Sequence, residues 1–498
     1  MNAPPPAAAP KARAAGLLRA RPVWMAPLVP ATVLMFFMTL FYIGAIVNPT
    51  GHLRGLPVAL VNEDRGAVVA GERVDLGADV ASQLLQAHEV TSRLSLKEAP
   101  DAEADALMDS DKAFEAIIVP PDFSARILWA YGLTSTREAA PTVQVEANPR
   151  AGSTGVQLAS GVAEPALEQV STALGKSLSE EAARLHRSPR SGTNTSEPVT
   201  VVVGDFRSLP PDSALGLSAF YISLLALMCG FLGAVLVNSS VDAALGYGTT
   251  EVGPRWRQRL PVNISRWQTL LVKWSVALLT VPTLTGVLLL VSVAVLHMNA
   301  PHAGVLWTFT SFAGLAIAAG TLALFATFGS LGQLLAMLVF VYLALASSGG
   351  TIPVQALPSF FRFTASFEPL RQVLGGVRAI LYFNAQGDAG LDRGFVLSAI
   401  GLALWIAVGT VVTKWYDRRG LDRLNRDVLE FMQRSARAYL AGTPGPEPAR
   451  VGRDQRPRPA GGPGVGGGQP LGKGNQDQDA QPDRRYSASA PKTRAASK

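Results

Sequence analysis

Long apolar runs that are nearly free of charged residues alternate with polar stretches along this chain of 498 residues. One run lies near the N-terminus, at Trp24–Val47, and five more lie between residues 213 and 413. A helix needs about 20 apolar residues to cross a bilayer, and five such runs in one soluble domain would leave it almost no polar surface. The pattern therefore predicts a multi-pass α-helical membrane protein with six transmembrane helices. We expect these helices at residues 22–47, 214–237, 267–296, 304–328, 331–347 and 394–413.

The stretch between the first two apolar runs, residues 48–212, has the pattern of an α/β domain. Short apolar runs end in turn signals, as LPVALV does before Asn62–Gly66, and longer segments carry apolar residues at helical spacing. We expect a large extracytoplasmic α/β domain inserted between helices 1 and 2. Its predicted strands are 56–61, 114–119, 142–147 and 200–203, and its predicted helices are 78–87, 123–131 and 156–185.

Charge is distributed unevenly. The whole chain has a net charge of +7, yet residues 48–212 contain 14 Lys/Arg against 23 Asp/Glu. The basic excess therefore lies beside the apolar runs and in the C-terminal tail, as the positive-inside rule predicts for cytoplasmic segments. This distribution predicts a multi-pass protein of the cell membrane with both termini in the cytoplasm, and it argues against a nucleic-acid partner.

The two ends of the chain differ in character from the apolar block. The first run is longer than the apolar region of a signal peptide, so we expect residues 1–21 to remain as a cytoplasmic segment. Residues 414–441 begin with a basic cluster suited to anionic lipid and continue as a predicted juxtamembrane cytoplasmic helix. Residues 442–498 are rich in Gly, Pro and Gln, a composition typical of disorder.

The sequence contains no pattern that predicts an enzyme. Its single cysteine, Cys229, lies in an apolar run and excludes both a disulfide framework and a cysteine metal site within the chain. Residues 467–474 resemble a phosphate-binding loop but end in Gly474 instead of Ser or Thr. The predicted helices also carry no carboxylate that could relay protons. We therefore expect no catalytic residue, no metal and no cofactor, and an energy source outside this chain.

Two loops of the apolar block stand out. Residues 238–266 carry Arg255, Trp256, Arg257 and Arg259, which predict a short interfacial helix because Trp lies well at the headgroup level. The segment after residue 347 combines helix breakers, aromatic residues and one acid, and it predicts a re-entrant or interfacial hairpin shielded by protein. The residues that carry this second prediction are Gly349, Gly350, Pro353, Phe360, Phe361 and Glu368.

Three quoted stretches carry a resemblance to a known family. LPVALVNEDRGA follows the first apolar run, FEAIIVPPDFS comes later in the insert, and SSGGTIPVQALPSFFRFTASFEPLRQVLGGVRAILYF precedes the last run. In this order they resemble the phage infection protein (Pip/YhgE-like) group of ABC type-2 permease-like membrane proteins. The resemblance covers roughly residues 20–415. Fungal drug-resistance membrane proteins share the same broad organisation.

The resemblance implies a permease subunit of an ABC type-2-like exporter or secretion system. Such a subunit would act as a homodimer or heterodimer with a separate nucleotide-binding ATPase. The loop with Arg255–Arg259 would then couple to that ATPase, whereas the residues by themselves are equally well explained as a topology anchor. The alternative function is a non-transporting surface receptor or a scaffold component of a secretion apparatus.

Overall fold

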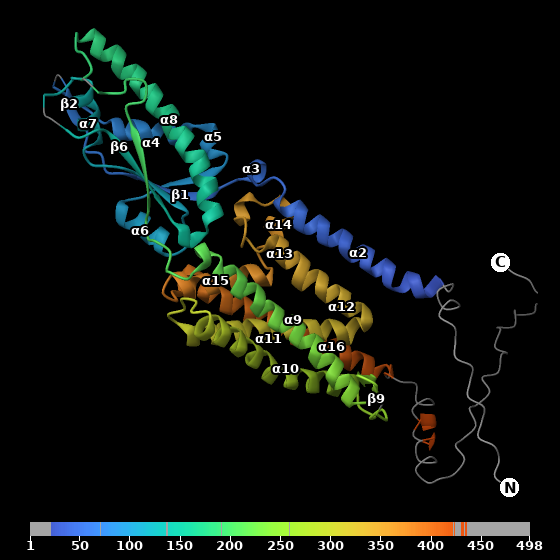
Figure 1. Ribbon diagram of the computed structural model, residues 1–498. Helices are drawn as coiled ribbons and strands as arrows, with labels where there is room; N and C mark the ends of the chain where they lie inside the picture. Colours follow the sequence, from blue (N-terminus) through green and yellow to red (C-terminus); the bar gives the residue numbers. More distant parts are fainter. Residues whose placement is uncertain are drawn as a thin grey trace, which may run out of the picture.

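The computed structural model describes residues 21–435 except 70, 136, 137, 191, 258, 422, 424–429 and 433. A mixed sheet with its helices lies at one end of the molecule, and a bundle of apolar helices extends from it (Figure 1). The predicted segment 1–21, apart from Arg21, and the tail 442–498 lie outside the described residues. So does half of the juxtamembrane helix that the sequence predicts over residues 414–441.

Six helices in the described part of the chain are long and apolar enough to cross a membrane, as the sequence predicts. They are α2 (Arg21–Ile46), α9 (Ser218–Ala244), α10 (Arg266–Leu289) with the π-helical turn η3 (Leu290–Val295), α11 (Ala303–Phe328), α12 (Ser330–Met337) with η4 (Leu338–Leu343) and α13 (Ala344–Ser347), and η6 (Gly387–Leu391) with α16 (Asp392–Arg418). The second predicted helix is too short, because α9 continues past residue 237 to Ala244.

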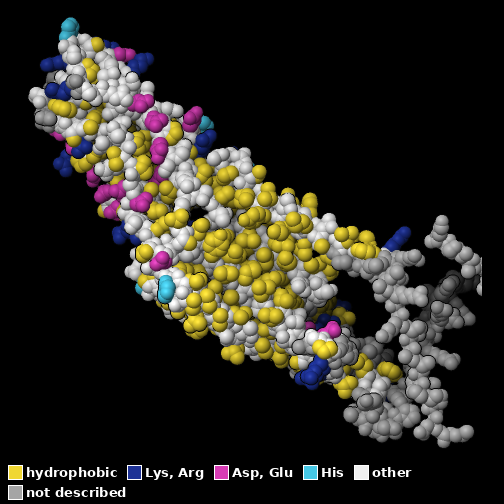
Figure 2. Space-filling model, in the orientation of Figure 1, with side chains coloured by type: hydrophobic (Ala, Val, Ile, Leu, Met, Phe, Trp, Pro, Cys, Tyr) yellow, Lys and Arg dark blue, Asp and Glu magenta, His cyan; other side chains and the backbone are white. Residues whose placement is uncertain are grey.

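The bundle is built around α11, which packs against α9, α10 and α16. Small residues permit these contacts: a Cβ on Gly230 of α9 would lie 2.4 Å from the Gly314 carbonyl oxygen of α11. Hydrophobic side chains cover the outside of the bundle, whereas charged side chains gather on the sheet end and at the opposite end (Figure 2). An apolar exterior around an apolar interior is what a membrane-embedded helix bundle requires.

The helix α2 is set apart from the core of this bundle. Its described side chains are mostly exposed, and it packs chiefly on η4 and α13. Near its C-terminal end, the Phe41 ring meets the Phe361 ring edge-on with centroids 6.1 Å apart. Phe361 belongs to α14 (Ser359–Thr364), so α2 is tied to the segment that joins the fifth and sixth apolar helices.

The sheet has five strands within the described residues, in the order β4-β1-β5-β6-β7. The strands β4, β1 and β5 are parallel, β6 is antiparallel to β5, and β7 is parallel to β6. The bounds are β1 (Leu56–Asn62), β4 (Leu94–Glu98), β5 (Glu115–Val119), β6 (Thr142–Ala147) and β7 (Thr200–Asp205). All four predicted strands are therefore confirmed, while β4, with its polar sequence LSLKE, was not predicted.

Helices cover both faces of this sheet, which explains why β1 is apolar along nearly its whole length. One face packs against α4 (Leu76–Gln86), α7 (Phe123–Ala130) and α8 (Ser153–Arg184), and the other against α6 (Asp101–Asp109). The smaller elements are α3 (Pro49–His52), β2 (Ala67–Val69), β3 (Glu72–Val74), α5 (His88–Thr91), η1 (Pro149–Ala151) and η2 (Ala214–Gly216). We refer to residues 48–212 as the sheet region.

A connecting segment, residues 348–386, joins the sheet region to the bundle. It contains η5 (Val354–Ala356), α14 and the mostly buried α15 (Pro369–Tyr382). Ala356 packs into the core of the sheet region, and the Gln355 carbonyl accepts a 3.0 Å hydrogen bond from the Arg54 backbone N–H. The Arg362 guanidinium donates to the carbonyl oxygens of His52, Gln355 and Leu357 at 2.9 to 3.1 Å. The sheet region therefore rests directly on this segment.

Candidate functional site

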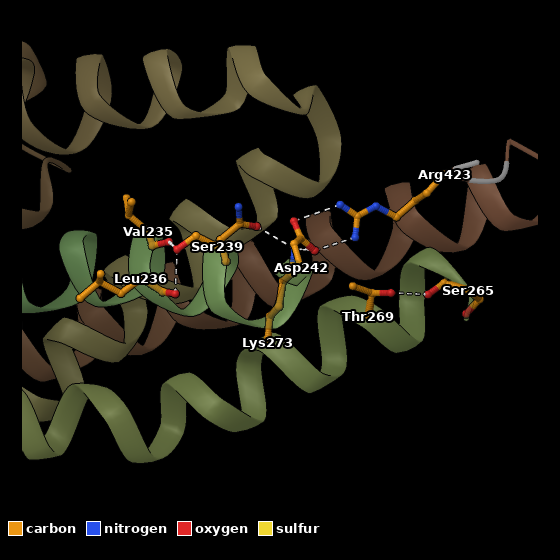
Figure 3. A network of polar contacts seen from close by, with 9 residues as sticks. Val235, Leu236, Ser239, Asp242, Ser265, Thr269, Lys273 and Arg423 are labelled. Carbon is orange, nitrogen blue, oxygen red and sulfur yellow. Dashed lines mark hydrogen bonds and ion pairs between the residues drawn. The ribbon is translucent and has the colours of Figure 1, made fainter. Parts of the chain in front are cut away.

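A mostly buried cluster of charged side chains (Figure 3) lies where α9 ends, at the end of the bundle farthest from the sheet region (Figure 1). The Asp242 carboxylate, in the last turn of α9, accepts hydrogen bonds from both Nη atoms of Arg423 at 2.7 and 3.0 Å. Lys273 Nζ of α10 lies 2.8 Å from Asp242 Oδ1 and also donates to Asn238 Oδ1 at 2.7 Å. The three ionised side chains are 8 to 24% exposed and line a cavity of about 350 Å³. We call this group the Asp242 cluster.

The helix ends around the Asp242 cluster are held together by polar contacts. Asp417 of α16 accepts hydrogen bonds from the backbone N–H groups of Arg266 and Trp267, at 2.9 and 3.0 Å, and so caps the start of α10. Tyr416 donates its hydroxyl to the Thr327 carbonyl of α11 at 3.0 Å. Three apolar helices are thereby fixed against one another at the level of the cluster.

The position of Asp242 corrects a prediction. The expectation that the apolar helices carry no carboxylate depended on a helix ending at residue 237, but the second apolar helix includes Asp242. Lys273 of the third apolar helix is only 8% exposed in its side chain and is paired with this carboxylate. The opposite charges are compatible with an apolar helix end because they neutralise each other.

The predicted interfacial helix with Arg255, Trp256, Arg257 and Arg259 is wrong. The residues form a two-stranded antiparallel hairpin of β8 (Thr250–Val252) and β9 (Arg255–Arg257), turned at Gly253 with φ +57°. Gly253-Pro254 disfavours a helix, and the alternation Arg-Trp-Arg suits a strand, on which Arg255 and Arg257 share one face. Arg255, Arg257 and Arg259 are exposed, so this basic hairpin projects beyond the apolar helices.

The residues predicted to form a re-entrant hairpin lie in four different places. Gly349, with φ +72°, lies beside Val354 and Arg371, and Gly350 passes close to α9, where a Cβ on it would lie 2.1 Å from the Phe220 ring. Phe360 is exposed and Phe361 is buried, and both rings lie near Phe41 of α2. Pro353 precedes η5 beside the sheet region, while Glu368 lies inside the bundle. The irregular backbone agrees with the prediction, but these residues form no single site.

Glu368 borders an apolar cavity of about 300 Å³ within the bundle. The cavity is formed by α11, η4, α16 and the start of α15, and its walls include Ile317, Phe340, Leu343, Gly401, Leu404 and Trp405. The Glu368 side chain is 2% exposed and caps α15 by accepting the N–H groups of Leu370 and Arg371 at 2.9 and 3.0 Å. Burial raises the pKa of Glu368 to about 7, against the lowering effect of these two hydrogen bonds. The arrangement can hold an apolar molecule beside one carboxyl group.

Residues 28–411 match the family described as "Protein of unknown function (DUF3533)". The chain belongs to the DUF3533 family. The match extends from α2 through α16, so this DUF3533 chain shares with its family both the sheet region and the apolar helices. No curated protein sequence matches the chain.

Two features of this DUF3533 chain were missed by sequence reasoning. The Asp242 cluster draws on three segments that are far apart in sequence, and the signal for it was the apolar spacing that continues through Val241 to Leu245. The second feature is a contact between Asp111 of the sheet region and Arg378 of α15. The contact gives the buried Arg378 of α15 a carboxylate partner from a distant segment of the chain.

Proposed function

We propose that this DUF3533 chain is the membrane permease subunit of an ABC type-2-like exporter or secretion system, which moves a substrate across the cell membrane. In this proposal the sheet region is an inserted extracytoplasmic α/β domain, and both termini and the basic hairpin β8–β9 are cytoplasmic. The observation that carries the proposal is the apolar cavity beside Glu368, because an apolar molecule needs such a space inside a bundle of apolar helices to pass between two aqueous sides.

A separate ATPase supplies the energy in this proposal. The exposed arginines of β9 and the Asp242 cluster lie at the same end of the bundle, so a subunit that docks on the hairpin also meets the ends of α9, α10 and α16. A basic hairpin suits an acidic docking surface. The resemblance to type-2 permease-like proteins supports the same arrangement and a homodimer or heterodimer.

Affinity purification of the full chain from its own cells tests the ATPase partner. We expect an ATP-hydrolysing subunit in the wild-type sample and at least a tenfold lower yield of it with Arg255→Ala/Arg257→Ala. The matched control is Arg54→Ala, an exposed arginine at the other end of the bundle, which should not change the yield. Recovery of no ATPase would contradict the proposed partner.

Transport is tested in inverted vesicles with ethidium, an apolar cation suited to an apolar cavity with one carboxyl group. We expect ATP-dependent accumulation, and a strong reduction with Gly401→Trp, because Gly401 faces the cavity and a Cβ there would meet no atom within 4 Å. Val411→Trp, at an outward position on α16 that is 66% exposed, is the control. If no ATPase is recovered and vesicles accumulate no dye, the permease proposal fails, and a surface receptor or secretion scaffold becomes the better explanation.

A further inference from the structure

A second cavity, of about 270 Å³, lies at the junction between the sheet region and the bundle. Its walls come from the start of α8, the start of α9, the connecting segment near Gly349 and Gly350, and one side of α15. Apolar side chains such as Phe220 and Val354 form part of the lining. The lining also includes three ionised side chains, which are Asp111, Arg371 and Arg378. We call this the junction cavity.

The cations of the junction cavity are incompletely neutralised. Arg378 is 8% exposed in its side chain, and its Nη1 lies 3.5 Å from Asp111 Oδ2, at the outer limit of a hydrogen bond. Within the described residues the Arg371 guanidinium has no hydrogen bond and no ion pair. Burial and the neighbouring charge of Arg378 together lower the pKa of Arg371 to about 10, with partial compensation by Asp111. Two guanidinium groups thus share one distant carboxylate.

The helix α8 adds a further positive pole. Its first residues, Ser153–Gly155, line the cavity, and no side chain caps its N-terminus. The first N–H groups of a helix have no partners within the helix and attract anions. Gly152, with φ +128°, precedes the helix, and a Cβ there would approach Arg378 Nη2 to 3.3 Å. The missing side chain therefore leaves open the space between the helix start and the guanidinium.

We propose that the junction cavity binds a phosphate group through Arg371, Arg378 and the N-terminal N–H groups of α8. Guanidinium groups bind phosphate oxygens through paired N–H donors, and a phosphate monoester or diester carries the negative charge that the cavity lacks. The cavity lies where α9 begins, and Leu217 and Phe220 bring apolar surface beside the cations. This placement suits the phosphate of a phospholipid headgroup as well as a free phosphate. The site does not depend on the proposed transport function.

Thermal unfolding of the purified full chain tests the site with inorganic phosphate, using chloride at equal ionic strength as the reference. We expect phosphate to raise the Tm of the wild type. Arg371→Gln should weaken phosphate binding by roughly 10- to 100-fold, the effect of losing one hydrogen bond to a charged group. In chloride, Arg371→Gln should unfold at the same or a higher temperature than the wild type, because it removes a cation that repels Arg378.

The Tm of Arg371→Gln in chloride separates a binding role of Arg371 from a purely structural one. If Arg371 were purely structural, its replacement would lower this Tm. Arg54→Gln, an exposed arginine outside the cavity, should keep the full phosphate effect. The second test variant is Asp111→Asn/Arg378→Gln. It replaces both members of the ion pair, so the pair's net charge does not change, and it should also bind phosphate more weakly.

The source of the phosphate is decided by reconstitution in nanodiscs of phosphatidylcholine with or without phosphatidylglycerol. Stabilisation by phosphatidylglycerol that Arg371→Gln abolishes identifies a lipid headgroup, whereas stabilisation only by inorganic phosphate identifies the free ion. The proposal is overturned if neither probe stabilises the wild type, or if Arg371→Gln retains the full stabilisation by both.

Discussion

Two charge clusters mark the two ends of the helical bundle, and each sets one carboxylate against two cations. At the end away from the sheet region, Asp242 contacts Lys273 and Arg423 at 2.7 to 3.0 Å. At the junction, Asp111 is 3.5 Å from Arg378, and Arg371 has no hydrogen-bond or ion-pair partner among the residues that the structure describes. The charges are alike, and the geometry differs.

The difference separates a structural cluster from a binding site. Asp242 uses both oxygens on Arg423 and one of them on Lys273 as well, so the cluster is satisfied within the chain and holds α9, α10 and the residues after α16 together. The junction keeps unused N–H donors beside an open cavity. An unsatisfied cation costs stability, which is recovered when an anion binds.

The proposed topology puts the two clusters on opposite sides of a membrane, and labelling of single cysteines tests this directly. In a Cys229→Ala background, cysteines at the exposed positions Ser82 and Gln386 should react with an impermeant maleimide in intact cells. A cysteine at Thr249, beside β8, should react only after lysis. We expect an all-or-none difference, since an intact bilayer excludes the reagent. Labelling of Gln386 only after lysis would place both clusters on one side.

Breaking the Asp242 cluster should give the largest loss of stability. Asp242→Asn removes the carboxylate from between Lys273 and Arg423, and we expect unfolding in detergent to become easier by about 3 kcal/mol, as for other buried ion pairs that lose one partner. Adding Lys273→Met should recover part of the loss, because it removes an uncompensated buried charge. The control is Asp388→Asn, whose pair with Lys112 at 3.3 Å is exposed and should contribute less than about 1 kcal/mol.

The titration of Glu115 in the sheet region sharpens the comparison of the two clusters, because Glu115 is a buried carboxyl group without a cation beside it. Glu115 of β5 is fully buried, Ser160 donates a hydrogen bond to its Oε1, and its Oε2 has no partner among the described residues. Burial raises the pKa of Glu115 from 4.5 to about 7, so the folded state favours the protonated form.

The contribution of Glu115 to the stability of the fold is fully present below pH 4.5, and it is lost as the pH rises through about 7. We expect the free energy of unfolding to fall by about 2 kcal/mol between pH 5 and pH 8. Glu115→Gln should flatten this pH dependence, and Glu98→Gln, at an exposed position on β4, should leave it unchanged. An unaltered pH profile in Glu115→Gln would show that this carboxyl group is ionised in the folded protein throughout the range.

The smallest expected effect is at the junction. Because the Asp111–Arg378 contact is long, Asp111→Asn should cost only about 1 kcal/mol in chloride, measured by thermal unfolding. The same substitution should strengthen the stabilisation by phosphate, since it removes the negative charge that competes with the ligand. Asp109→Asn, which breaks an exposed pair with Arg207, should not change the phosphate effect. A loss in Asp111→Asn as large as that in Asp242→Asn would mean that the two clusters do not differ.

The apolar helices were predictable because spanning a bilayer demands a long run of one kind of residue. The end of α9 was misplaced because Asn238 and Asp242 look like the start of a loop, and only the partners Lys273 and Arg423 make the carboxylate compatible with a helix end. In the sheet region, the four strands with apolar or alternating runs of Val, Ile and Leu were found, whereas the strand β4 was not, because its sequence LSLKE has only two apolar residues.

The candidate sites were less accessible from sequence because they combine distant segments. Gly349 and Gly350 indicated a broken helix, but nothing in the sequence indicated that Gly350 passes against Phe220 of α9. Glu368 was noticed, yet its place at an apolar cavity depends on the packing of α11, η4 and α16. The Trp and Arg residues around Arg255 suit an interfacial helix, but the turn at Gly253-Pro254 makes the segment a two-stranded hairpin.

The length and placement of the helix α8 have a mechanical consequence. It starts at the junction cavity and runs to the far tip of the sheet region (Figure 1). At a rise of 1.5 Å per residue, its 32 residues form a lever about 48 Å long. A rotation of about 5° at its base would carry the tip through about 4 Å, at the helix length given by that rise. If an anion between the guanidinium groups and the helix start turned α8 by this angle, the far tip of the sheet region would move by this distance.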